Sequence, residues 1–154
     1  MIEGVVGELA DVWRPHLEIY VVRPVRGFVD AAFERTDRPL IVTAEFESVL
    51  PRLEQTIRWA NEKAVAIPSS DIVGPGPIPE VSKLLVIRST EATRAIARQF
   101  EATLRTAYPA RTRDAVDSLR TGSPWPGAAI IWIRIDGDTT ELLDGPPRGV
   151  TLGR

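Results

Sequence analysis

Apolar residues recur along this chain at helical spacing in some stretches and at strand spacing in others. The clearest helical pattern covers 50–67, where Leu53, Ile57, Ala60 and Ala64 form an apolar seam between two flanking prolines. Weaker patterns predict helices over 3–14, from about 90 to 107, and over about 111–120.

Short apolar runs predict the strands. They cover 17–22, 27–34, 39–47, 83–89, 128–135 and 139–143. We interpret the second and third runs as the arms of one hairpin. The last two flank an Asp-Gly pair, which favours a tight hairpin turn. The run over 83–89 is continuously apolar at its centre, as expected of a strand covered on both faces.

The predicted elements follow one another along the chain in the order α, β, β, β, α, β, α, α, β, β. A strand that follows a long helix favours a mixed sheet with helices on its faces. The stretch 69–82 holds two glycines and three prolines, so we predict a surface loop there. The fold class is therefore α/β, with a mixed central sheet flanked by helices.

Composition places the chain among globular proteins. It has 154 residues, with 44% hydrophobic and 26% charged residues, which suits one domain over 1–154. It contains no cysteine, and its first residues resemble neither a signal peptide nor a membrane anchor, so we expect a cytoplasmic protein without membrane contact. The net charge of −2 argues against a protein that coats nucleic acid, but not against a nuclease.

Three carboxylates are the candidate chemistry. Side chains two residues apart on a strand share a face, so Glu45 and Glu47 project together from 39–47. If 27–34 pairs with that strand, Asp30 approaches Glu45, although the register is not derivable from the sequence. Carboxylates held together repel one another unless a cation lies between them, and Mg²⁺ is the hard ion that such oxygens bind.

These residues resemble the motifs of the PD-(D/E)XK restriction-endonuclease-like superfamily. Its members place an aspartate on one strand, here Asp30, and Glu-x-Lys or a variant on the next, here Glu45 and Glu47. The resemblance implies a Mg²⁺- or Mn²⁺-dependent nuclease with these three as catalytic residues and the first two as metal ligands. It also implies supporting roles for Glu8 on the first helix and for Gln55, which precedes a tryptophan where members carry tyrosine.

The resemblance covers about 3–107 and implies an αβββαβ core, to which a C-terminal helix and β-hairpin over about 111–143 are added. The sequence departs from the family at Glu47, where most members have lysine. We consider Lys63, on the long helix, as a displaced lysine. The substitution also fits a domain that kept the fold and lost the chemistry.

A second hypothesis is a non-catalytic binding or oligomerisation domain associated with a DNA-binding transcriptional regulator. The sequence has a looser similarity to the C-terminal domains of actinobacterial helix-turn-helix regulators. In that case Trp13, Trp59 or the hairpin over 128–143 would form a partner surface. The partners considered are therefore nucleic acid in the first case and a second copy of the chain in the other.

Each candidate also has a plain structural interpretation. The acidic residues could lie on a solvated strand face. His16, the single histidine, favours a structural or solvated role. Arginines 94, 98 and 105 share a helix face, where a solvated surface with glutamates is favoured over a phosphate-binding ridge.

Overall fold

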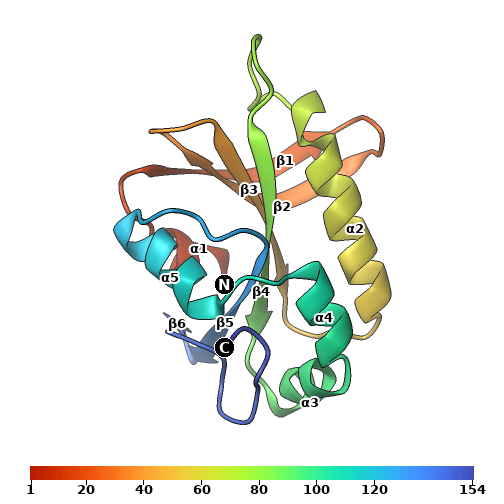
Figure 1. Ribbon diagram of the computed structural model, residues 1–154, viewed down its shortest axis with the longest axis vertical. Helices are drawn as coiled ribbons and strands as arrows, with labels where there is room; N and C mark the ends of the chain where they lie inside the picture. The colour runs from red at the N-terminus through yellow and green to blue at the C-terminus, as the bar shows by residue number, and fades with distance from the viewer.

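The computed structural model describes all residues, 1–154, as a mixed sheet with helices packed on it (Figure 1). The strands are β1 (Trp13–Val21), β2 (Gly27–Arg35), β3 (Leu40–Glu47), β4 (Glu80–Arg88), β5 (Ala129–Asp136) and β6 (Thr139–Leu142). The helices are α1 (Ile2–Val6), α2 (Leu53–Ala66), the 3-10 turn η1 (Ile67–Ser69), α3 (Glu91–Gln99), α4 (Glu101–Ala107) and α5 (Thr112–Thr121).

The six strands lie in sequence order across a single sheet. Strands β1, β2 and β3 form an antiparallel meander, and α2 then carries the chain back so that β4 runs parallel to β3. Strand β5 is parallel to β4, and β6 folds back antiparallel. The expected mixed α/β architecture is confirmed, and so are the hairpins β2–β3 and β5–β6.

The sheet separates two layers of helices. One face packs against α1 and α5 through a cluster that includes Val42, Ala44 and Val86. The other face packs against α2, α3 and α4 through Leu85, Ile87 and neighbouring residues. Because adjacent residues of β3 and β4 point to opposite faces, both strands need apolar side chains on either side, which explains the continuous apolar run in β4.

The N-terminal prediction was wrong. The helix expected over 3–14 ends at Val6, and Trp13 already belongs to strand β1. Leu9 and Trp13 have helical spacing, but Trp13 pairs with Arg35 of β2 instead. The tryptophan is buried and donates a hydrogen bond from Nε1 to the carbonyl of Ser118 at 2.8 Å. Tertiary pairing has therefore overridden a local pattern.

The helix expected up to 107 is divided at Phe100 into α3 and α4. In α3, Thr93 and Ala97 are buried and Ala92 is exposed. The predicted start is confirmed, because the Thr90 side chain caps α3 in a reciprocal capping box.

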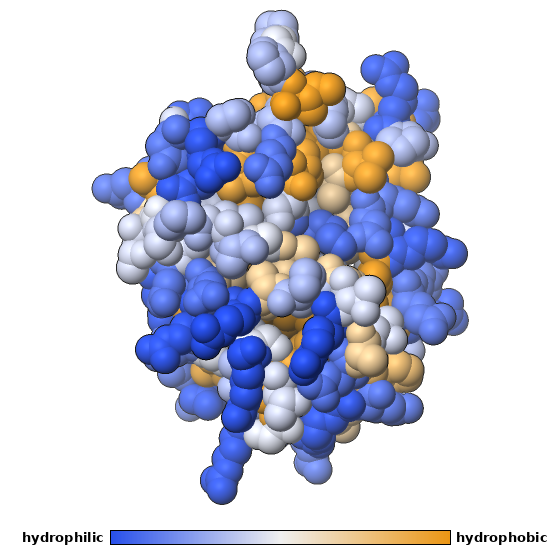
Figure 2. All heavy atoms as spheres, in the orientation of Figure 1, coloured by the Kyte–Doolittle hydropathy of each residue, from blue (hydrophilic) through white to orange (hydrophobic).

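Charged and polar side chains cover much of the face seen in Figure 2, with apolar atoms between them toward the end where α2 leads into β4. None of the helices combines the length and the apolar character that a membrane crossing requires.

Candidate functional site

Glu45 is a buried carboxylate on the face of β3 that meets α2. Its Oε2 accepts a hydrogen bond from the Nζ of Lys63 on α2 at 2.7 Å. Its other oxygen, Oε1, is buried without a hydrogen-bond partner. Burial raises the pKa of Glu45 to about 7, because the partial compensation by the Lys63 ammonium is smaller than the desolvation cost.

Asp30 meets β3 where the β2–β3 ladder ends. The last paired residues are Ala31 and Ala44, and the next step along the ladder would bring Asp30 opposite Glu45. Instead, Oδ2 of Asp30 accepts a hydrogen bond from the backbone N–H of Phe46 at 3.0 Å. The aspartate therefore replaces a backbone partner at the point where the two strands diverge.

The backbone near Asp30 is irregular. Val29 shares an apolar cluster with Ala32, whereas Ala31 lies in the cluster on the opposite face. Glu18, at the corresponding point of β1, has a φ of 51° and interrupts the β1–β2 pairing. Strict alternation is thus lost at Asp30, which explains why no register could be assigned to it beforehand.

Glu47 completes the acidic group, two residues beyond Glu45 on the same strand. Burial raises the pKa of Glu47, and the Asp30 charge raises it further. The Asp30 and Glu47 charges also raise the pKa of Glu45. The three residues are therefore near enough to repel one another, with Lys63 as the cation among them. In their present conformations, the side chains of Asp30, Glu45 and Glu47 do not converge closely enough to act together as three ligands of one metal ion.

Two buried groups that no sequence pattern indicated lie on this side of the sheet. Tyr108, at the end of α4, has a buried hydroxyl without a hydrogen-bond partner. Burial raises the pKa of Tyr108, and the Glu45 and Glu47 charges raise it further. The indole N–H of Trp132 on β5 is also buried and unpaired. No local motif signals either residue, because both reach this region through the tertiary fold.

Two other predicted site residues lie elsewhere. Glu8 pairs with Arg120 of α5 at 2.5 Å, on the side of the sheet opposite α2. Gln55 lines a pocket at the start of α2, together with Ile96 and Phe100. It lies two turns along α2 from Lys63, or about 12 Å by the helical rise. The structure thus brings Lys63 to the acidic residues but not Glu8 or Gln55.

Three further residues considered in the sequence lie at or near the protein surface and outside the acidic group. His16 contacts the Glu34 carboxylate at 2.8 Å. Arg105 pairs with Glu101 one turn away, as the solvated-surface interpretation expects. Trp59, considered above as part of a partner surface, is 50% exposed.

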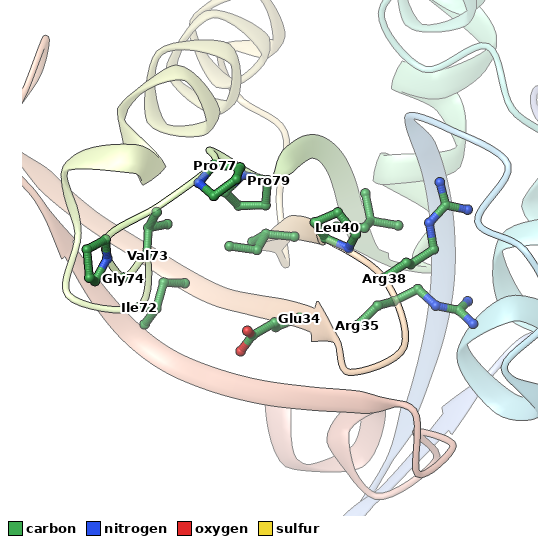
Figure 3. A pocket seen from close by; sticks show the side chains of 12 residues that line it. Glu34, Arg35, Arg38, Leu40, Ile72, Val73, Gly74, Pro77 and Pro79 are labelled. Carbon is green, nitrogen blue, oxygen red and sulfur yellow. The ribbon is translucent and has the colours of Figure 1, made fainter.

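A separate pocket of about 200 Å³ lies between the Pro-rich loop and the start of β3 (Figure 3). Pro77 and Pro79 form one wall, and Glu34, Arg35 and Arg38 lie along the other. The guanidinium of Arg35 is already bound by Asp37. Because the pocket contains none of the three acidic residues, we do not assign the candidate chemistry to it.

Comparisons with protein families, with curated proteins and with solved structures find no match for this chain. The resemblance to the PD-(D/E)XK superfamily therefore remains a prediction from the motifs.

Proposed function

We propose that this chain is a divalent-metal-dependent nuclease-like domain that hydrolyses nucleic-acid phosphodiesters at the group formed by Asp30, Glu45, Glu47 and Lys63. The observation that carries the proposal is the state of Glu45. This carboxylate is buried, has one oxygen without a partner, and is repelled by two further carboxylates. Buried polar groups with a purely structural role normally have hydrogen-bond partners. A binding site therefore explains why one oxygen of Glu45 is buried without a partner.

The donor set fits Mg²⁺ or Mn²⁺ in chemical type. Asp30 and Glu45 supply hard carboxylate oxygens, and Oε1 of Glu45 is free of other bonds. Three enclosing carboxylates are not required, since Mg²⁺ is commonly held by one or two and completes its shell with water and phosphate oxygens. When bound, such an ion polarises a phosphoryl oxygen and makes water a better nucleophile.

In this proposal, side chains of the protein accept the proton of the attacking water and stabilise the charge that develops on the phosphate. Glu47, whose pKa is raised by burial, accepts the proton of the attacking water. The water oxygen bonds to phosphorus, the bond to one ester oxygen breaks, and that oxygen takes a proton from solvent. The ammonium of Lys63 stabilises the negative charge on the phosphoryl oxygens. In this proposal Lys63 replaces the lysine that the related motif carries at the position of Glu47.

Cleavage of supercoiled plasmid and of circular single-stranded DNA, with Mg²⁺ or Mn²⁺, tests the proposal. We expect cleavage by the wild-type chain, none by Asp30→Asn or Glu45→Gln, and wild-type cleavage by the control Glu54→Gln on the exposed side of α2. Equal cleavage by all four proteins would reveal a contaminating nuclease, and absence of cleavage by the wild type on every substrate would reject the proposal.

A second candidate function, a dimerising interaction domain, is favoured by one surface. Leu17, Tyr20 and Phe28 of β1 and β2 are 52%, 47% and 59% exposed. Tyr20 and Phe28 are cross-strand partners whose ring centroids are 5.2 Å apart. Exposed apolar residues beside the edge strand β1 are typical of an interaction surface.

Light scattering after size exclusion distinguishes this candidate. It predicts a dimer that Tyr20→Ser with Phe28→Ser converts to a monomer, whereas Val65→Ser, at an exposed apolar residue of α2, leaves the dimer intact. A wild-type monomer at all concentrations would exclude this second function.

A further inference from the structure

Lys83 is a partly buried cation without an anionic partner. It lies on β4 opposite Thr43 of β3, on the same side of the sheet as Glu45. Its Nζ donates to the side-chain oxygen of Asn61 on α2 and lies 4.8 Å from the centre of the Tyr108 ring. Lys83 takes part in none of the ion pairs of the chain. Its ammonium is therefore held by an amide and an aromatic face, neither of which neutralises its charge.

Open space borders this ammonium on two sides. A cavity of about 610 Å³ between α2 and α4 is lined by Lys83, Asn61, Thr103 and Thr106, among others. A second cavity, of about 460 Å³, lies along the other side of Lys83 between α2 and the start of β4. The first presents the Asn61 amide and the Thr103 hydroxyl beside the cation, which are groups that donate hydrogen bonds to an oxyanion. The Thr106 hydroxyl instead donates to the carbonyl of Ala102.

A partly desolvated charge is costly unless a counter-charge or hydrogen bonds offset its burial. Burial lowers the pKa of Lys83, which is the direction expected when no anion compensates. Tyr108 is near both groups, because its ring centre lies 4.8 Å from the Lys83 Nζ and the Glu45 charge raises the pKa of its hydroxyl. The two sites therefore share Tyr108 as a neighbour.

We propose that Lys83, with Asn61 and Thr103, forms a phosphate-binding subsite in the cavity between α2 and α4. The ligand class is a phosphate group, either free or carried by a nucleotide. As far as it concerns catalysis, this inference rests on the proposed function: the subsite would hold a substrate phosphate next to the one that is cleaved. Phosphate binding itself requires no metal.

Isothermal titration with inorganic phosphate, with a 5′-nucleoside monophosphate and with a short single-stranded oligonucleotide, all in EDTA, tests the subsite. We expect saturable binding that weakens about tenfold or more in Lys83→Met, the loss expected for a charge-assisted contact. Arg58→Met, an exposed cation on α2, should bind as the wild type does. Tighter binding of the oligonucleotide than of free phosphate would identify a nucleic-acid source, and the reverse order a free-phosphate site.

An NMR titration of the wild type guards against a Lys83 variant that fails to fold. Phosphate should shift the amide signals of Asn61, Thr103 and Thr106, and shifts confined to other regions would overturn the subsite. So would wild-type affinity in Lys83→Met. Glu45→Gln separates the two proposals, since it should abolish cleavage while phosphate affinity is unchanged. Lys83-dependent binding without any metal-dependent cleavage would reject the nuclease and leave the subsite standing.

Discussion

The Nζ of Lys63 lies 2.7 Å from Oε2 of Glu45, which joins helix α2 to strand β3 inside a largely buried contact. The two side chains are 23% and 10% exposed, so solvent screens their attraction less than it does for surface pairs. The pair places the ammonium of Lys63 beside the acidic residues. In most proteins with the related motif, the ammonium comes instead from a lysine at the position of Glu47. The pair also contributes to the stability of the fold, because removing either partner leaves the other, largely buried charge without its counter-charge.

Lys63→Met tests the role of the ammonium. We expect DNA cleavage to fall by roughly 100-fold, since a charge that stabilises the phosphoryl oxygens is lost. Lys63→Arg keeps the charge and should retain part of the activity, and Arg58→Met, on the same helix, should cleave as the wild type does. Full activity in Lys63→Met would show that this residue takes no part in catalysis.

The stability of the protein should depend on pH through Glu45. Its pKa is raised from an ordinary value of 4.5 to about 7 in the folded chain. Between pH 4.5 and about pH 7, the folded state therefore keeps a proton on Glu45 that the unfolded state has released. The free energy of unfolding therefore decreases as the pH rises through this window, by up to about 3 kcal/mol in the absence of metal. Glu45→Gln should flatten the decrease, whereas Glu54→Gln should not.

Urea unfolding at about pH 5 and about pH 8 in EDTA measures this difference. A decrease of the same size in wild type and Glu45→Gln would show that another group is responsible.

Much of the fold follows from local patterns. The apolar seam of α2 specifies a helix because its buried residues recur at helical spacing. Strand β3 is instead buried on both faces along most of its length, and its short run of β-branched and apolar residues is what indicates a strand. The Asp136-Gly137 turn could be predicted because glycine adopts the positive φ of 56° that the turn requires. Strand β1 was missed at its start, since Trp13 is positioned by contacts with residues distant in sequence.

The candidate site was predictable in part. The alternation of β3 was enough to place Glu45 and Glu47 on one face, and helical spacing made Lys63 a candidate. The contributions of Tyr108 and Lys83 could not be predicted, because α4 and β4 come beside α2 through the tertiary fold alone. The hydrogen bond from the Phe46 N–H to the Asp30 carboxylate depends on an irregular strand, which the sequence does not encode visibly.

Arg35 should be essential for stability although it lies outside the site. It is 6% exposed, donates to the carbonyls of Gly122 and Ser123 at 2.8 Å, and stacks 5.0 Å from the centre of the Trp13 ring. Arg35→Met leaves the Gly122 carbonyl without a side-chain partner and removes one of the two donors to the Ser123 carbonyl, the other being the Ser118 hydroxyl. We therefore expect a loss of about 2–4 kcal/mol in the free energy of unfolding. Arg38→Met, at an exposed pair, should cost less than about 1 kcal/mol. Similar losses in chemical denaturation of the two variants would refute this account.

Gly122 should not tolerate a side chain. It ends α5 with a φ of 78°, and a Cβ there would lie 2.9 Å from Cγ2 of Val12. Gly149 has a similar positive φ, of 82°, but the nearest atom to the position that a Cβ would take there is Nη1 of Arg98, at an ordinary contact distance of 3.7 Å. Both alanine variants introduce backbone strain of about 1 kcal/mol, and Gly122→Ala adds a steric cost, so its midpoint of thermal unfolding should be the lower. The reverse order would contradict the packing described here.

Anomalous diffraction from crystals soaked in Mn²⁺ tests the metal site most directly. We expect a peak within coordination distance of a carboxylate oxygen of Asp30 and of Oε1 of Glu45, and no such peak in Glu45→Gln crystals. Wild-type crystals with no peak at these carboxylates, at a Mn²⁺ concentration that supports cleavage, would contradict the proposal.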